Sequence, residues 1–281
     1  MKYVIKFFDF CLNSSIWVAV AVCALLEVTN SALGQNATGS LLRFVFCGTV
    51  AGYNFIKFFE QERFPLLLLS QPHLWINGFV TKSLYVKLVM LLSLCCSLGC
   101  LYYSFYLKLN TLLVIGVSAL LVLFYAISFR GRTLRSTSGI KIYVVGIVWA
   151  LVTVILPYTE AKLGVNLEVL IIFIQRFLFV VILMLPFEIR DLKVDDENLG
   201  TLPQKIGIGY TKLLGGVLLV IVYVLEFFKE GGGDVSMIVT ALILLLTFVF
   251  VLRATVKQSK YYSSFFVEGI PVLWWLILLM L

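Results

Sequence analysis

Histidine and charged residues are scarce in this 281-residue chain. His73 is the single histidine, so sites that need two or more imidazole ligands, such as a diheme centre or a zinc-protease site, are excluded. Charged residues make up 13% of the chain and hydrophobic residues 61%, and the mean hydropathy is +1.04. These values lie far from those of soluble globular domains, so the composition predicts an integral membrane protein.

No stretch of the sequence resembles a cleavable signal segment, an internal repeat or a Gly/Ser linker. Its first apolar run, 11–33, is too long for a signal peptide and has no small-residue cleavage site. Helical runs of roughly 20 apolar residues match the thickness of a bilayer. We therefore expect one all-helical domain over residues 1–281, a polytopic membrane bundle of about nine helices.

Nine apolar runs carry this expectation. They are 11–33, 41–59, 84–106, 109–129, 139–158, 166–186, 211–228, 235–254 and 266–281. Cytoplasmic loops collect lysine and arginine, and 17 of the 22 such residues fall on the N-terminal side of this arrangement, against 4 on the other. The sequence thus predicts a cytoplasmic N-terminus and, because the number of spans is odd, a C-terminus on the opposite side.

The net charge of +7 reflects this topological bias and suits an anionic lipid surface, so it is no argument for nucleic acid. The six cysteines fall within or at the edges of predicted helices, where cysteine behaves as a small hydrophobic residue. We expect membrane lipids as partners, and neither a disulfide nor a thiolate metal site.

Acidic residues gather in one stretch, LPFEIRDLKVDDENLGTLPQKIG at 185–207, on the predicted cytoplasmic side. If the preceding helix continues past Pro186, Glu188, Asp191 and Asp195 stand at i, i+3 and i+7 and share one face. Three repelling carboxylates favour a cation between them, and Mg²⁺ prefers carboxylate, water and phosphate oxygens. The stretch therefore indicates a Mg²⁺ site, with a charged loop that only keeps the protein soluble and oriented as the alternative.

The same stretch resembles the second aspartate-rich motif of the UbiA-type membrane prenyltransferase superfamily. That motif runs Asn or Asp, two residues, Asp, three residues, Asp, then a turn and Thr-Leu-Pro, and Glu188, Asp191, Asp195 and 201–203 follow in this order. Members are nine-helix bundles with both acidic motifs facing the cytoplasm. The resemblance implies Mg²⁺-dependent transfer of a polyprenyl group from a prenyl diphosphate to a lipid-soluble acceptor. It makes the three acids metal ligands, and Asp191 and Asp195 catalytic.

The first acidic motif of that superfamily is incomplete in this chain. The matching stretch is GYNFIKFFEQER, in which Asn54 fits, Phe55 and Phe58 occupy the aspartate positions, and Glu62 stands where the last acid is expected. Lys57 shares a helical face with Asn54. We expect Asn54 to help bind the diphosphate, and Lys57 either to neutralise the phosphate directly or to reach the lipid head groups from the helix end.

Other polar residues receive roles from the resemblance. Those expected near the diphosphate are Tyr125, Ser128, Arg130, Arg132, Arg135 and Lys205. A positively charged cytoplasmic loop is the alternative for at least two of the arginines. Arg176, beside Gln175 within a span, is expected to face the interior, either as a structural residue or lining the tail cavity, with Glu27 as a partner by depth. Glu268 is expected to face the cavity.

Three functions from different classes remain open on these residues. The first is the Mg²⁺-dependent prenyl transferase. The second is a relative that has lost the reaction and serves as a lipid-binding or assembly protein, which the incomplete first motif favours. The third is a small cation-linked transporter, although transporters usually carry their acids near the bilayer midplane rather than at its edge.

Overall fold

The structure is a computed structural model that describes residues 2–34, 38–62, 84–126, 128–129, 132–133, 139–164, 166–195, 199–229 and 234–281. Three residues considered above, His73, Arg130 and Arg135, lie outside these ranges, as does almost all of the predicted loop 60–83.

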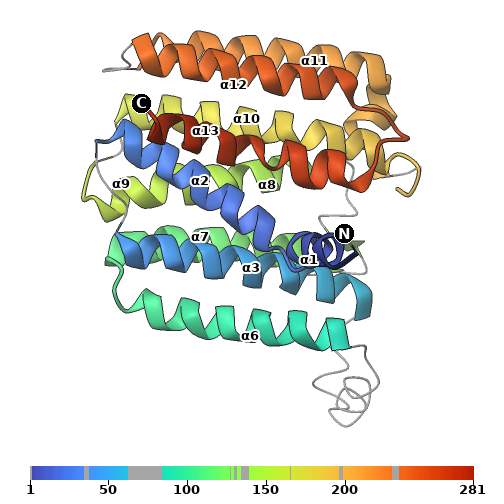
Figure 1. The fold of residues 1–281 in the computed structure, drawn as a ribbon. Coiled ribbons are helices and arrows are strands. Elements are labelled where there is room, and N and C mark those ends of the chain that lie inside the picture. The colour runs from blue at the N-terminus through green and yellow to red at the C-terminus, as the bar shows by residue number, and fades with distance from the viewer. Residues whose placement is uncertain are drawn as a thin grey trace.

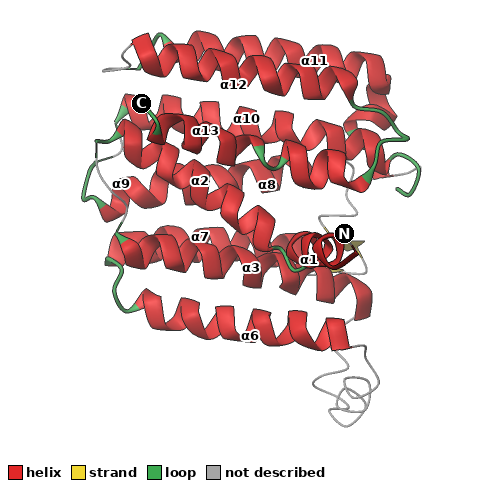
Figure 2. Cartoon of the chain, viewed as in Figure 1, coloured by secondary structure: helices red, strands yellow, loops and turns green. Residues whose placement is uncertain are grey.

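Helices make up nearly all of the described chain, as Figures 1 and 2 show. They are α1 (Lys2–Asn13), α2 (Ile16–Ala32), α3 (Gly39–Glu62), α6 (Leu84–Ser104), α7 (Leu109–Ala126), α8 (Lys141–Ala150), η2 (Leu151–Ile155), α9 (Leu156–Glu160), α10 (Leu167–Asp191), α11 (Leu202–Glu226), α12 (Asp234–Arg253), η4 (Tyr262–Val267) and α13 (Ile270–Leu279). A short antiparallel hairpin joins β1 (Ser128–Phe129) to β2 (Arg132–Thr133). The predicted all-helical class is confirmed.

Among the described residues, seven helical segments are long and apolar enough to cross a bilayer. They correspond to the seven predicted spans from 84–106 onward. Segments Ile5–Asn13 and Ile16–Ala32, which meet at an angle of 66°, form an eighth if they count as one span. The remaining predicted span, 41–59, lies within the 24 residues of α3. The chain is an integral membrane protein.

The helices lie side by side, with α11 and α12 along one edge of the bundle and α6 along the other (Figure 1). α10 is the central helix, because 61% of its apolar window is buried, against 11% for α6. The two termini lie at opposite ends of the bundle, in agreement with an odd number of spans.

Small residues allow the central helices to approach closely, as is common between membrane helices. A Cβ added to Gly215 of α11 would lie 2.9 Å from Leu185 Cδ1 of α10. On α8, a Cβ at Gly146 would lie 3.0 Å from the ring of Phe177, also on α10. These contacts fix the position of α10, and with it the acidic residues at its end.

The connection between the predicted spans 166–186 and 211–228 is much shorter in the structure than those bounds imply. α10 continues through Pro186 to Asp191, and α11 begins at Leu202 rather than near 211. Thr201 is the N-cap of α11, and its N–H donates a 3.0 Å hydrogen bond to Gln204 Oε1. Gly207, at φ +80°, interrupts α11, so the polar first turn is offset from the apolar part of the helix. Hydropathy alone therefore placed the start of this helix too late in the sequence.

The predicted span 109–129 is also too long. α7 ends at Ala126, because the chain turns there into the hairpin in which Ser128 pairs with Thr133. The backbone polar groups of Ser128 and its neighbours are thus satisfied across a sheet rather than along a helix.

Candidate functional site

The three predicted carboxylates meet at one end of α10, here called the acid-rich end (Glu188, Asp191 and Asp195). Glu188 and Asp191 stand one turn apart in α10. Asp195 lies in the turn that follows α10, and its backbone N–H donates a 2.9 Å hydrogen bond to Asp191 O. Glu188 interacts electrostatically with both other acids. The prediction that all three share one helical face is wrong, because α10 ends at Asp191.

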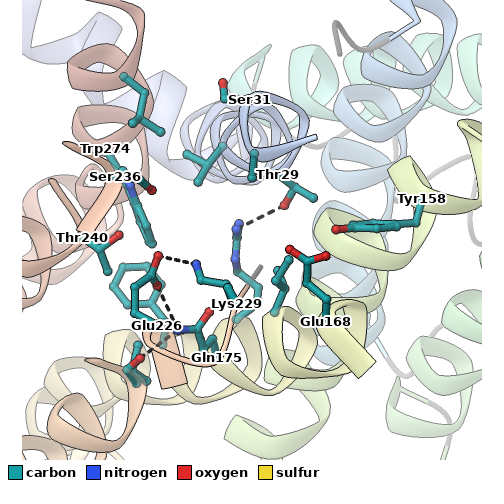
Figure 3. Close-up of a pocket in the computed structure, with 17 residues that line it drawn as sticks. Thr29, Ser31, Tyr158, Glu168, Gln175, Glu226, Lys229, Ser236, Thr240 and Trp274 are labelled. Carbon is teal, nitrogen blue, oxygen red and sulfur yellow. Dashed lines mark hydrogen bonds and ion pairs between the residues drawn. The ribbon is translucent and has the colours of Figure 1, made fainter. Parts of the chain in front are cut away.

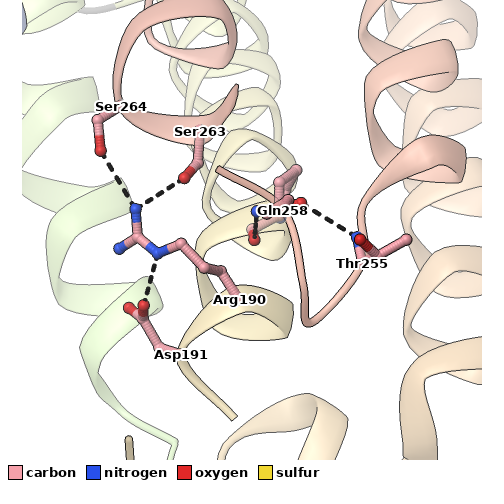
Figure 4. A network of polar contacts seen from close by, with 7 residues as sticks. Arg190, Asp191, Thr255, Gln258, Ser263 and Ser264 are labelled. Carbon is pink, nitrogen blue, oxygen red and sulfur yellow. Dashed lines mark hydrogen bonds and ion pairs between the residues drawn. The ribbon is translucent and has the colours of Figure 1, made fainter. Parts of the chain in front are cut away.

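Arg190 ties the acid-rich end to a distant part of the chain (Figure 4). Its Nε donates a 2.7 Å hydrogen bond to Asp191 Oδ1. Its Nη1 donates to Ser263 Oγ at 2.8 Å and to Ser264 Oγ at 3.2 Å, both on the π-helical segment η4. Sequence reasoning missed this role, although the adjacency of Arg190 to Asp191 was a signal.

A second link in the same network involves Gln258. Its Nε2 donates a 2.7 Å hydrogen bond to the carbonyl oxygen of Pro186, and its Oε1 accepts one of 3.1 Å from Thr255 N–H. Figure 4 shows these contacts beside Arg190. The segment between α12 and η4 therefore holds both the backbone and the side chains of the last turns of α10.

Asp9 of α1 binds this segment from the other side. Its Oδ1 accepts hydrogen bonds of 2.5 Å from Lys260 Nζ and 2.8 Å from the Tyr261 hydroxyl. These hydrogen bonds raise the pKa of Lys260 and of Tyr261 above their ordinary values. α1 is thus tethered near the acid-rich end.

Glu188 is the most deeply buried of the three acids, with 2% of its surface exposed. Its carboxylate accepts a hydrogen bond from the backbone N–H of Leu202 and interacts electrostatically with Lys141 of α8. Because Leu202 opens α11, the positive end of that helix also favours the negative charge. Lys141 was not among the predicted site residues.

Tyr125 lies close to the acid-rich end. It is buried at the end of α7, near Glu188 and near Tyr53 of α3. The Tyr53 hydroxyl accepts a 2.8 Å hydrogen bond from Trp149 Nε1. The hydrogen-bonded pair of Tyr53 and Trp149 therefore lies beside Tyr125, which is the aromatic residue near Glu188.

The remaining predicted residues on this side lie in the hairpin and in α11. Lys205 is exposed, and its Nζ comes within 3.8 Å of the Cβ position of Gly139. Gly139 in turn donates its N–H to Leu199 O at 3.2 Å, which joins the connection before α8 to the one before α11. Ser128 and Arg132 belong to β1 and β2, and their side chains lie outside the described part of the structure.

Asn54 binds protein groups at the break between α1 and α2. Its side chain is fully buried, and its Oδ1 accepts a 2.9 Å hydrogen bond from Ser15 Oγ. Its Nδ2 donates to Ser14 O at 3.0 Å and to Ser93 Oγ of α6 at 2.9 Å. Since Ser15 has a left-handed backbone with φ 64°, these contacts hold a conformation that is strained for a non-glycine residue.

Lys57 binds the same break. Its Nζ donates hydrogen bonds of 2.9 Å to Asn13 O, at the end of α1, and of 2.8 Å to Ser15 Oγ. It also interacts electrostatically with Glu268, and Glu268 interacts electrostatically with Arg190 as well. The expected cavity-facing Glu268 thus lies between two cations from α3 and α10.

Arg176 lies elsewhere, and its predicted partner is wrong. Its Nη1 donates to Leu25 O at 2.6 Å and its Nη2 to Thr29 Oγ1 at 3.2 Å. The carboxylate that interacts with it electrostatically is Glu226 at the end of α11, not Glu27. Depth along α2 suggested Glu27, but the antiparallel packing of α11 on α10 brings Glu226 to the same level.

Comparison with known proteins identifies the fold. No protein-family model matches the sequence, and no curated protein matches it. A solved UbiA homologue from Archaeoglobus fulgidus, bound to GPP and Mg²⁺, aligns with a TM-score of 0.64 and 13% identity over 96% of this chain and 97% of its own. The apo UbiA homologue from Aeropyrum pernix K1 aligns with a TM-score of 0.65 and 16% identity, over 95% and 99%. This chain has the UbiA fold.

A solved structure of digeranylgeranylglyceryl phosphate synthase also aligns, with a TM-score of 0.57 and 16% identity over 100% of both chains. The alignments therefore span the whole bundle. The resemblance drawn from the acidic stretch is confirmed at the level of the UbiA fold.

Two of the solved structures of UbiA homologues hold Mg²⁺ with GPP or DMAPP. The side chains at the acid-rich end can therefore be compared with the ligands that Mg²⁺ requires. Within the described ranges, no group of three or more His, Cys, Asp or Glu side chains is arranged to hold a metal. Mg²⁺, however, commonly takes one or two carboxylates and completes its shell with waters and substrate phosphate. Asp191, 22% exposed, and neighbouring Asp195 fit that donor set.

Proposed function

We propose that this chain transfers a polyprenyl group from a prenyl diphosphate to a lipid-soluble acceptor, with Mg²⁺, at the acid-rich end of α10. The observation that carries the proposal is the meeting of Glu188, Asp191 and Asp195 at one end of a UbiA fold, beside Arg190 and Lys141. The solved UbiA homologue bound to GPP and Mg²⁺ supports it. The distribution of lysine and arginine supports a cytoplasmic location for this end.

Mg²⁺ at this end would neutralise charge on the diphosphate as it leaves. In the proposed arrangement Asp191 and Asp195 hold the metal, and the more deeply buried Glu188, which accepts a hydrogen bond from the Leu202 N–H, adds negative charge near them. Arg190 orients Asp191 through its 2.7 Å hydrogen bond. Charge-assisted contacts of this kind keep a carboxylate in one orientation before the substrate arrives.

Cationic and polar groups around the acids are proposed to bind the diphosphate itself. In this proposal they are Lys205 at the start of α11, and Ser128 and Arg132 on the hairpin that follows α7. Asn54 and Lys57 act less directly in this proposal, because their hydrogen bonds hold the α1–α2 break.

The prenyl group would ionise next to the buried aromatic residues. Tyr53, Tyr125 and Trp149 are proposed to line this part of the site, where ring faces stabilise an allylic cation. The burial of Tyr125 and Trp149 would keep water from competing with the acceptor for that cation.

The experiment is Mg²⁺-dependent consumption of geranylgeranyl or farnesyl diphosphate by the purified protein in nanodiscs, measured as diphosphate release. Asp191→Ala is the test variant, and Arg253→Gln, at the end of α12, is the control. We expect release that requires Mg²⁺, is lost in Asp191→Ala and persists in Arg253→Gln. Release that is independent of Mg²⁺ or unchanged in Asp191→Ala would contradict the proposal.

A second candidate is a protein that binds prenyl diphosphate or lipid without turning it over. Phe55 and Phe58 replace the acids expected on α3, and Asn54 engages its amide in three hydrogen bonds to protein. Equilibrium binding of geranylgeranyl diphosphate distinguishes the two candidates, since saturable binding with no diphosphate release over hours would favour the second.

A further inference from the structure

A pocket of about 240 Å³ lies at the end of the bundle opposite the acid-rich end (Figure 3). Its walls come from the end of α2, the start of α10, the end of α11, the start of α12, and α13. Arg176, in its wall, precedes Asp191 on α10 by a helical length of about 22 Å at 1.5 Å per residue. The pocket is therefore separate from the proposed reaction site.

Arg176 is the central charged group of this pocket. It is 5% exposed, and its two hydrogen bonds go to neutral oxygens, Leu25 O at 2.6 Å and Thr29 Oγ1 at 3.2 Å. The ring of Trp274 lies 5.8 Å from its guanidinium carbon. A guanidinium has five N–H donors, so this one is held in a fixed orientation while it retains donor capacity toward the pocket.

The neighbouring acid in the pocket is already bound by other groups. Glu226 Oε2 accepts a 3.0 Å hydrogen bond from Gln175 Nε2, and its Oε1 lies 2.5 Å from Lys229 Nζ. Figure 3 shows both contacts on one side of the pocket. Glu226 and Lys229 thus neutralise each other at contact distance, while Arg176 interacts with Glu226 only over a longer range.

The rest of the lining is amphipathic. The hydroxyl groups of Ser31, Ser236 and Thr240 contribute polar atoms, while Ile172 and Leu278 contribute apolar ones. Ser31 is exposed, which places an opening at the end of α2. A lining of this kind suits a polar group that is attached to an apolar body.

A second carboxylate limits the charge that the pocket accepts. Glu168 lines it near Tyr158, with which it interacts electrostatically. With Arg176, Lys229, Glu226 and Glu168 together the lining has no net charge. Because the lining has no surplus positive charge, it disfavours a polyanion such as a diphosphate more than a group with one negative charge.

We propose that this pocket binds the phosphate-bearing head group of a membrane phospholipid, with the phosphate accepting hydrogen bonds from Arg176. Arginine matches phosphate oxygens in a forked geometry. A volume of about 240 Å³ holds a head group but not its acyl chains, which stay in the surrounding bilayer. This goes beyond the proposed transfer reaction and does not depend on it.

The test is native mass spectrometry of the purified protein in a neutral detergent with EDTA, so that no Mg²⁺ supports phosphate binding at the acid-rich end. The protein is titrated with dioleoyl phosphatidylglycerol and, separately, with dioleoylglycerol, which has the same chains and no phosphate. We expect the phosphatidylglycerol to bind at least tenfold more tightly. Equal binding of the two lipids would overturn the proposal.

Variants locate the binding. Arg176→Gln removes the charge, and Ser236→Phe fills the pocket while leaving Arg176 in place, so one variant can fail to fold without ending the test. Both should lose the tenfold preference, and Arg253→Gln at the other end of α12 should keep it. A preference that persists in a folded Arg176→Gln or Ser236→Phe protein would overturn the assignment.

A competition arm separates the lipid from free phosphate, which shares its chemistry. Inorganic phosphate at millimolar concentration should leave the bound phosphatidylglycerol in place, because it lacks the apolar body that the lining contacts. Displacement by inorganic phosphate would overturn the lipid assignment and identify the pocket as a site for the free anion.

Discussion

Arg190 and Ser263 lie 73 positions apart in sequence, yet the guanidinium Nη1 of the first donates a 2.8 Å hydrogen bond to the hydroxyl of the second. The same guanidinium holds Asp191 at 2.7 Å. One arginine thus joins the acid-rich end of α10 to the last helical unit of the chain, and it sets the orientation of a proposed metal ligand.

Replacing Arg190 tests that positioning role. In Arg190→Gln the Asp191 carboxylate loses its charged partner, and loss of such outer contacts typically lowers metal affinity by about 10- to 100-fold. We expect the Mg²⁺ concentration for half-maximal diphosphate release to rise by about tenfold, with a smaller change at saturating Mg²⁺. Arg253→Gln is the matched control, and an unchanged Mg²⁺ dependence in Arg190→Gln would refute the role.

Substitutions at Asn54 and Ser93 should destabilise the α1–α2 break to different degrees, because Asn54 makes three hydrogen bonds there and Ser93 makes one of them. Asn54→Ala removes three hydrogen bonds and leaves Ser14 O and Ser15 Oγ without this partner, so we expect a loss of about 2 kcal/mol in the free energy of unfolding. Ser93→Ala removes one of the three, and about 0.6 kcal/mol is typical between membrane helices. Thermal unfolding in one detergent compares them, and equal losses would contradict the assignment.

Gly207 and Gly209 stand two residues apart in α11 and should respond in opposite directions to alanine. Gly207 has φ 80° and ψ 161°, a region nearly restricted to glycine, so Gly207→Ala should cost about 1–3 kcal/mol. A Cβ at Gly209 would meet no atom within 4 Å, and Gly209→Ala should stabilise the helix by up to about 1 kcal/mol. A similar shift in melting temperature for both variants would argue against the kink.

The Glu226–Lys229 pair should respond unequally to removal of its two partners, because their side chains are 2% and 17% exposed. Lys229→Met leaves the buried carboxylate without its cation and should cost about 3 kcal/mol. Glu226→Gln keeps an acceptor for Gln175 Nε2, and Lys229 can extend toward the surface, so the cost should be nearer about 1 kcal/mol. Chemical denaturation of the two variants measures the difference, and the reverse order would contradict the geometry.

Features carried by neighbouring residues were predictable. The apolar runs predicted a helix at 166–186, which the structure has as the first part of α10. The spacing of Glu188, Asp191 and Asp195 brought attention to the right end of α10. Where polar residues continue a helix beyond its apolar part, as from Leu202 onward, hydropathy underestimated its length.

Long-range contacts were not predictable in the same way. Lys57 was expected at phosphate or head groups, but it hydrogen-bonds to Asn13 O and Ser15 Oγ and interacts electrostatically with Glu268. Nothing in the sequence around Arg176 indicates that Glu226, on the neighbouring helix, is closer in space than Glu27.

The sequence by itself determined that this chain lies in a membrane as helices and carries its acids at one end, because burial of apolar runs and local spacing depend on neighbouring residues alone. Only the tertiary structure decided which polar groups meet: Asn54 with the α1–α2 break, Arg190 with η4, and Arg176 with a pocket at the opposite end. In a low-dielectric interior each buried polar group must find a partner, and which one it finds depends on how the helices pack.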